Sequence, residues 1–219
     1  MSIQEYYRSF YNEKQSKEKA EFDKKLICTN YEIKGVKTLE LEKFAKELVK
    51  QGFSFFDLPL QCHEDILIAG MFLKFEKNIE KKLLCLQKLL NYIDNWATCD
   101  MIACRFKNME KEKNFFYELL NDSNDFKVRF AIVWLKSFEL KFNLENVLQK
   151  IVAVQRENYF VKMAQAWTIA EGFVVDFEKT LNIFKNCDDK FVANKSIQKA
   201  CESFRITKEQ KEFLKKLKK

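Results

Sequence analysis

Apolar residues recur every three to four positions along most of this chain, which is the spacing of one face of an amphipathic helix. Residues 38–50, TLELEKFAKELVK, show the pattern clearly. Their apolar stripe comprises Leu41, Phe44, Ala45 and Leu48. Thr38 stands where a helix N-cap is expected, and Gly52 follows the stripe as a stop signal. This segment is therefore predicted to be a helix that covers a core with one face.

The same periodicity predicts about a dozen helices in all, joined by short polar links. The other predicted helices are two within residues 2–27 and one each at 63–75, 79–93, 97–105, 111–121, 126–138, 143–155, 159–174, 177–186, 190–203 and 207–217. The chain has one proline, Pro59, and four glycines, too few for a β-rich fold with many tight turns. The predicted fold class is all-α.

Short antiparallel helices form hairpins, and a hairpin buries its apolar face by stacking on the next one. Helix pairs recur at roughly 35 to 40 residues, close to HEAT-like spacing. We therefore expect an α-solenoid of about six HEAT-like hairpins, whose concave face can wrap an extended ligand such as a DNA duplex. No strict sequence repeat occurs, so an irregular helical bundle is the structural alternative. No composition shift marks a linker, which predicts a single domain over residues 1–219.

Charge and composition narrow the functional classes. Hydrophobic residues make up 47% of the chain, so it is expected to be globular. The N-terminus lacks the apolar core of a signal peptide, and no apolar run approaches the length of a membrane span. The net charge of +7 is concentrated in residues 190–219, which contain about 10 Lys and Arg but only 3 Asp and Glu. This basic region indicates either a polyanion partner or a solvated tail.

The cysteines and the one histidine bound the chemistry. Seven scattered cysteines without a CxxC pair are typical of free thiols in a reducing cytoplasm. His63 is the only histidine, which disfavours a His-based zinc site or a Cys–His catalytic pair. Neither a metal site nor a cofactor is predicted, and a cytoplasmic location is expected. The remaining candidate acids and bases are carboxylates.

The segment NYIDNWATCDMIAC, residues 91–104, places Trp96 and Asp100 one helical turn apart on one face. Asp100 lies in the otherwise uncharged stretch WATCDMIAC. A carboxylate on an apolar helix face is costly unless it is paired, capping or catalytic. In the structural alternative, Asp94 or Asn95 caps this helix and Asp100 caps a neighbouring element.

Two other tryptophans lie on apolar stripes. Trp167 follows Phe160 and Met163 at helical spacing, which favours core packing. Trp134 is likewise predicted to be in the core. Arg129 and Lys136 fall on the other side of that same helix, from which Arg129 can contact a phosphate.

Five motifs in order along nearly the whole chain resemble the DNA alkylation repair (AlkD-like) family of HEAT-like repeat DNA glycosylases. The first is an N-terminal Gly-Val turn with its following helix. The others are a Trp-x-x-x-Asp element, an arginine-presenting helix, a later tryptophan helix and a C-terminal signature. In this chain they read YEIKGVKTLELEKFAKEL, NWATCD, FKVRFAIVWL, YFVKMAQAWTIAE and NKSIQKACESFRITKEQKEFLKKLK.

The resemblance implies a site and a reaction. Active members of the family excise cationic N3- or N7-alkylated purines by hydrolysing the glycosidic bond. Trp96, Asp100 and Trp167 would then line a cleft on the concave face. Asp100 would stabilise the oxocarbenium-like transition state and orient the attacking water, and the indole faces would attract the developing cation.

The expected partner is double-stranded DNA, bound without sequence preference by a monomer that is nucleoid-associated when on DNA. The expected DNA-binding residues are Arg129, Lys162, Lys195, Lys199 and Arg205. One departure from the family pattern is Ala170, which stands where active members often have a basic residue. Two alternatives therefore stay open: a non-catalytic protein that binds damaged or branched DNA, and a helical scaffold for another protein.

Overall fold

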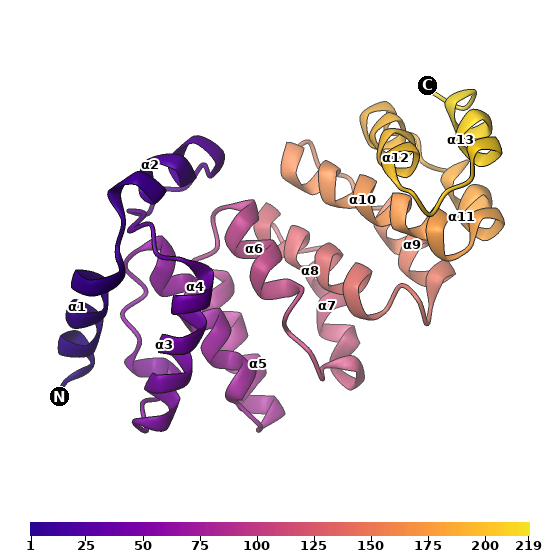
Figure 1. Ribbon diagram of the computed structural model, residues 1–219. Coiled ribbons are helices and arrows are strands. Elements are labelled where there is room, and N and C mark those ends of the chain that lie inside the picture. The colour runs from indigo at the N-terminus through magenta and orange to yellow at the C-terminus, as the bar shows by residue number, and fades with distance from the viewer. The chain divides into compact units, whose positions relative to one another are not determined.

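The computed structural model describes all 219 residues, and its regular secondary structure is entirely helical (Figure 1). The α-helices are α1 Ile3–Lys14, α2 Lys17–Leu26, α3 Thr38–Lys50, α4 His63–Phe72, α5 Ile79–Leu90, α6 Trp96–Ala103, α7 Lys113–Leu119, α8 Asp125–Phe138, α9 Leu144–Val152, α10 Tyr159–Val175, α11 Phe177–Phe184, α12 Lys190–Glu202 and α13 Lys208–Lys215. Short 3-10 turns cover Phe55–Asp57, Leu73–Phe75 and Glu110–Glu112. None of the helices has both the length and the apolarity needed to cross a bilayer.

The all-α prediction is confirmed, and the succession of short helices agrees with a helical-repeat fold. Each helix predicted with defined bounds is present, and no predicted end differs from the observed one by more than three residues. One detail differs. Thr38 is the first residue of α3 rather than its cap, because Lys37 occupies the N-cap position without a side-chain hydrogen bond.

Side-chain caps explain how the helices begin so closely after one another. Nine helices start after a Ser, Thr, Asn or Asp whose side-chain oxygen accepts a hydrogen bond from the first turn, and each such cap stabilises by about 0.5–2 kcal/mol. The capping residues are Ser2, Ser16, Asn78, Asn95, Asn124, Asn158, Asp176, Asp189 and Thr207.

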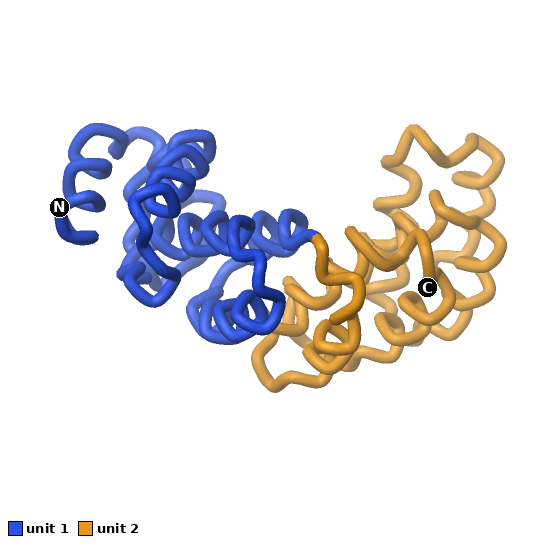
Figure 2. The backbone as a smooth tube through the Cα atoms, turned by 90° about the horizontal axis from the view of Figure 1, so that it is seen from below, with its two compact units in different colours: residues 1–107 blue, residues 108–219 orange.

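The chain forms two compact units, residues 1–107 and residues 108–219 (Figure 2). In the N-terminal unit, α3 and α6 pack against α4. In the C-terminal unit, α10 is central and packs against α8, α9, α11 and α12. Trp134 of α8 is completely buried there and stacks on Phe116 at a centroid distance of 3.6 Å, which confirms its predicted place in the core. The single domain and its concave face stay predictions.

The link between α2 and α3 passes close to the start of α2 at Gly35. Gly35 has φ +73°, a conformation that L side chains rarely adopt. A Cβ on this residue would lie 2.2 Å from the carbonyl oxygen of Ser16 and 2.5 Å from the amide nitrogen of Ala20. Only glycine lets the turn approach the start of α2 this closely.

A buried carboxylate holds the same turn in place. Glu64 of α4 is 2% exposed. It accepts hydrogen bonds from the backbone amides of Lys34, Gly35 and Val36 at 2.9, 2.7 and 3.3 Å. A buried charge is tolerated when hydrogen bonds satisfy it, so this contact fixes the Gly-Val turn of the sequence motif on α4.

The only histidine is also buried. His63, the first residue of α4, is 4% exposed, and its Nδ1 lies 3.2 Å from the hydroxyl of Thr98 on α6. Burial disfavours the imidazolium ion and lowers the pKa of His63 below its ordinary value of 6.5. The side chain therefore connects two helices as a neutral ring.

This burial predicts a pH dependence of stability. Because the pKa of His63 is lowered in the folded protein, the unfolded chain binds the proton more readily. The contribution of neutral His63 to the free energy of unfolding is complete above about pH 6.5. It is lost as pH falls toward the folded-state pKa, and the free energy then changes by at most about 1.4 kcal/mol per pH unit. Denaturant unfolding between pH 5 and 8 measures it. His63→Asn keeps a polar group near Thr98 and should flatten this part of the curve; equal slopes in both proteins would contradict the assignment.

Candidate nucleic-acid interface

Trp96 and Asp100 lie one turn apart on α6, as the sequence spacing predicts. Asn95 caps the helix, because its side-chain oxygen accepts a hydrogen bond from the Thr98 amide at 2.9 Å. Both Trp96 and Asp100 are half-buried rather than in the core. The indole N–H of Trp96 donates to the carbonyl oxygen of Leu26 at 3.2 Å, which ties the ring to the end of α2.

The start of α6 is anchored by a second carboxylate. Asp94 accepts hydrogen bonds from the hydroxyl of Thr29 at 2.7 and 2.9 Å and from the backbone amide of Asn30 at 2.7 Å. It also accepts a hydrogen bond from the side-chain amide of Asn95 at 2.9 Å. Contacts on both sides of the cap therefore hold α6 in a fixed position within the N-terminal unit.

In the C-terminal unit, Arg129 and Trp167 form a cation–indole contact. The guanidinium carbon of Arg129 lies 5.4 Å from the ring centroid of Trp167. Arg129 is 1% exposed and donates a hydrogen bond to the carbonyl oxygen of Phe160. Arg129 was expected on the outer side of α8, but the helix is buried from Val128 through Leu135 and has no outer side there. The buried Arg129 guanidinium instead packs against the Trp167 ring.

Trp167 is half-buried, so it is not the fully packed residue that periodicity favoured. It lines an open groove of about 530 Å³ between the end of α8, α10, and the end of α12 with its following link. The groove is lined by Lys136, Ser137, Lys141, Trp167, Ala170, Glu171, Val174, Lys199, Ser203 and Arg205. Four of these residues are cations and one is an anion. The ammonium of Lys136 lies 5.8 Å from the Trp167 ring centroid, so the indole makes cation–π contacts with both Arg129 and Lys136.

Two ion pairs organise the cations of the groove. Arg205 donates to both carboxylate oxygens of Glu171, at 2.9 and 2.6 Å. Lys199 donates to Glu202 at 2.8 Å. The Arg205–Glu171 pair joins the link after α12 to α10, whereas the Lys199–Glu202 pair lies within α12.

The five residues predicted to bind DNA are distributed differently in this unit. Lys199 and Arg205 line the groove, and Arg129 makes a cation–π contact with its tryptophan, Trp167. Lys162 does not line the groove and pairs with Glu157 and Asp189 at 2.7 and 3.0 Å. Lys195 also lies outside the lining and donates to Gln198 at 3.0 Å.

Two lysines of the groove, and two phenylalanines that adjoin its cations in the chain, were not among the residues predicted to bind DNA. Lys136 and Lys141 contribute two of the four cations. Phe142 and Phe204 are 86% and 102% exposed, and each adjoins a lining cation in the chain, Lys141 and Arg205 respectively. The sequence does contain a sign of them: in two of the links between predicted helices, a phenylalanine stands next to a cation. Aromatic rings interleaved with cations are typical of surfaces that bind nucleic acid.

Most of the chain matches one known protein family. The model of the family described as DNA alkylation repair enzyme matches residues 8–204, which include parts of both units. The match confirms the family resemblance that the five sequence motifs indicated. No curated protein and no solved structure matches the chain.

Proposed function

The chain belongs to the DNA alkylation repair enzyme family, and we propose that it excises cationic N3- or N7-alkylated purines from double-stranded DNA. The family supports a role in DNA repair with DNA as the partner. One observation carries the DNA-binding part of the proposal: four cations and an indole share one groove in the C-terminal unit. Such a groove suits a phosphate backbone and gives binding without sequence preference.

The proposed reaction is hydrolysis of the bond between the deoxyribose C1′ and the purine nitrogen. Alkylation makes the base a cation, so it departs as a neutral base and needs no strong general acid. Positive charge builds on the sugar as the bond breaks, and water adds its hydroxyl to C1′ while its second proton passes to solvent. Asp100 is proposed to stabilise the sugar cation and orient this water.

The two indoles have matching roles in the proposal. The Trp96 ring is fixed by its hydrogen bond to Leu26, and the Trp167 ring is supported by Arg129. Electron-rich ring faces attract a developing cation, and a rigid ring loses little entropy on contact. We propose that both rings contact the nucleotide that carries the lesion.

A second function, binding of damaged or branched DNA without excision, is favoured by one observation. Ala170 lines the groove at the position where active members often have a basic residue. A methyl group there supplies no charge to the sugar-phosphate backbone. The four cations of the groove make a pure protein scaffold the least supported of the three functions.

The catalytic proposal is tested by base release from N7-methylated duplex DNA. The wild-type protein should liberate free 7-methylguanine. Asp100→Asn should slow release by about a hundredfold or more, since it removes the charge and keeps the shape. Asp188→Asn, which removes an exposed carboxylate, is the matched control and should excise normally. The unfolding free energy should change little in both variants.

Two results would contradict this assignment. Normal excision by Asp100→Asn together with a large loss of stability would make Asp100 a structural cap. No base release by the wild-type protein, with DNA binding retained, would establish the non-catalytic function instead.

The salt dependence of DNA binding tests the groove. Lys199→Ala and Arg205→Ala should each weaken binding to any duplex sequence and reduce the slope of log K against log salt by about 0.9. Lys111→Ala, an exposed change outside the groove, should leave the slope as it is. Fluorescence anisotropy over a salt series measures all three. Unchanged slopes in the two groove variants would mean that the basic C-terminal segment is only a solvated tail.

The exposed phenylalanines predict a preference that charge alone does not give. Phe204→Ala should weaken binding to DNA containing unpaired bases by about tenfold, since stacking of one base on an aromatic ring is worth about 1–3 kcal/mol. Binding to an intact duplex should fall less, and the salt slope should stay the same. Phe213→Ala, which changes a half-exposed ring that does not adjoin a groove cation, is the control. An equal loss on both DNA forms would reject base stacking.

A further inference from the structure

The ring of Trp96 is oriented by a backbone atom of another helix. Its indole N–H donates a hydrogen bond to the carbonyl oxygen of Leu26, the last residue of α2, at 3.2 Å. Trp167 is held differently, since its ring lies against the buried guanidinium of Arg129. The direction of the Trp96 ring therefore depends on where the end of α2 lies.

The apolar packing of α2 does little to fix that end. Ala20, in the first turn, is the only buried residue of the helix. Farther along, Phe22 is 60% exposed and Leu26 is 55% exposed. Because a helix end with few buried contacts frays readily, polar contacts are needed to hold the Leu26 carbonyl in place.

A carboxylate just before α6 supplies these polar contacts. Asp94 accepts hydrogen bonds from the hydroxyl of Thr29 and from the backbone amide of Asn30, each at 2.7 Å, in the link that follows α2. Asn95, the N-cap of α6, is 1% exposed and donates to the same carboxylate at 2.9 Å. The hydrogen bond between Thr29 and Asp94, called the Thr29–Asp94 clamp below, therefore ties the end of α2 to the start of α6.

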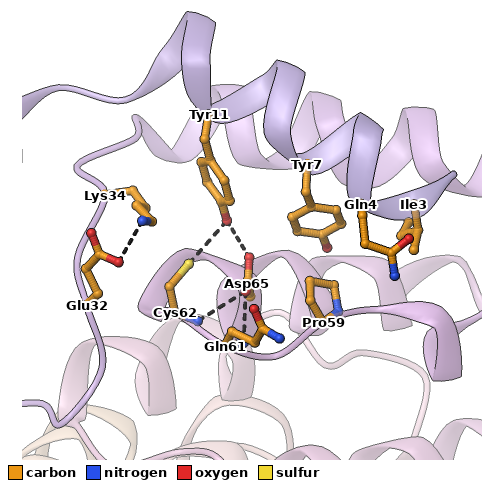
Figure 3. Close-up of a pocket in the computed structure, with 10 residues that line it drawn as sticks. All are labelled: Ile3, Gln4, Tyr7, Tyr11, Glu32, Lys34, Pro59, Gln61, Cys62 and Asp65. Atoms are coloured by element: carbon orange, nitrogen blue, oxygen red, sulfur yellow. Dashed lines mark hydrogen bonds and ion pairs between the residues drawn. The ribbon is translucent and has the colours of Figure 1, made fainter. Parts of the chain in front are cut away.

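Another carboxylate of the N-terminal unit fixes a link in the same way but in a different place. Asp65 accepts hydrogen bonds from the hydroxyl of Tyr11 and from two backbone amides, beside a cavity of about 360 Å³ (Figure 3). Trp96 does not line that cavity. Asp94 stands two residues before Trp96, so its contacts act directly on the indole of the proposed site.

We propose that Thr29 and Asp94 are positioning residues for the base excision proposed above. The clamp holds the Leu26 carbonyl, and this carbonyl directs the face of the Trp96 ring toward the nucleotide that carries the lesion. The inference rests on the proposed function, in which Trp96 contacts that nucleotide and Asp100, one turn along α6, stabilises the sugar cation. Displacement of such a group by about 1 Å can slow a reaction by about a hundredfold.

Single-turnover base release from N7-methylated duplex DNA measures the effect of removing the clamp. Thr29→Val keeps the shape of the side chain and removes the hydroxyl. At saturating protein it should slow base release by about tenfold while the Kd for the duplex changes by less than about twofold, because the cationic groove is untouched. A general loss of structure would not separate rate from affinity in this way.

Two further variants show whether the hydroxyl itself is responsible. Thr29→Ser keeps the hydroxyl and should restore the rate to within about twofold of the wild-type value. Thr38→Val is the matched control, since Thr38 is an exposed threonine at the start of α3 and takes no part in the clamp. It should release the base as the wild type does.

A nuclear magnetic resonance measurement tests the position of the ring without DNA. The chain has three tryptophans, so labelling them with ¹⁵N gives three indole N–H signals, and Trp96→Phe identifies the signal of Trp96. Thr29→Val should shift and broaden that signal, because the indole N–H loses a fixed acceptor. The signals of Trp134 and Trp167, which belong to the C-terminal unit, should stay where they are.

Three results would overturn the inference. They are base release by Thr29→Val at the wild-type rate, an unmoved Trp96 signal in that variant, and a slow rate that Thr29→Ser does not restore. Absence of base release by the wild-type protein is a different result, because it contradicts the proposed function. The Trp96 signal then still decides whether Thr29 holds the ring.

Discussion

Most of the thirteen helices in this protein are too short to persist alone, so they depend on packing against their neighbours. Isolated helices below about 12–15 residues are marginal in water. The longest here, α10, has 17 residues and is covered by α8, α9, α11 and α12. Stability therefore comes from packing one apolar face on the next, and the side-chain caps permit the close succession that this packing requires.

Two buried charges use this packing to position functional or connecting segments. Glu64 accepts hydrogen bonds from three backbone amides around Gly35. Arg129 donates to the Phe160 carbonyl oxygen, and its guanidinium lies against the Trp167 ring. A buried charge that loses its partners is strongly destabilising, so each group restricts its surroundings to one arrangement. The Trp167 indole of the groove therefore packs against a guanidinium that is itself held in place.

The sequence predicts the helices well because their apolar spacing is regular and polar residues separate them. It also predicts that Trp96 and Asp100 share a helix face, since one helix contains both. It fails for Arg129, because α8 is buried on nearly all sides and periodicity cannot tell inside from outside in such a helix. The groove is equally hidden, since Lys136, Lys199 and Arg205 come from separate elements and meet only through tertiary packing.

Because Arg205 is paired with Glu171, an anion that binds to Arg205 must first replace this carboxylate. A guanidinium that holds two carboxylate oxygens has the geometry with which it would hold a phosphate, so Glu171 occupies the place of a ligand. A single small anion gains little by replacing it, because one contact is exchanged for another. In the proposed DNA-binding role, a polymer of phosphates would gain more, since its neighbouring charges could reach Lys136, Lys141 and Lys199 at the same time. In that proposed role, the Arg205–Glu171 pair would favour a long polyanion over a single small anion.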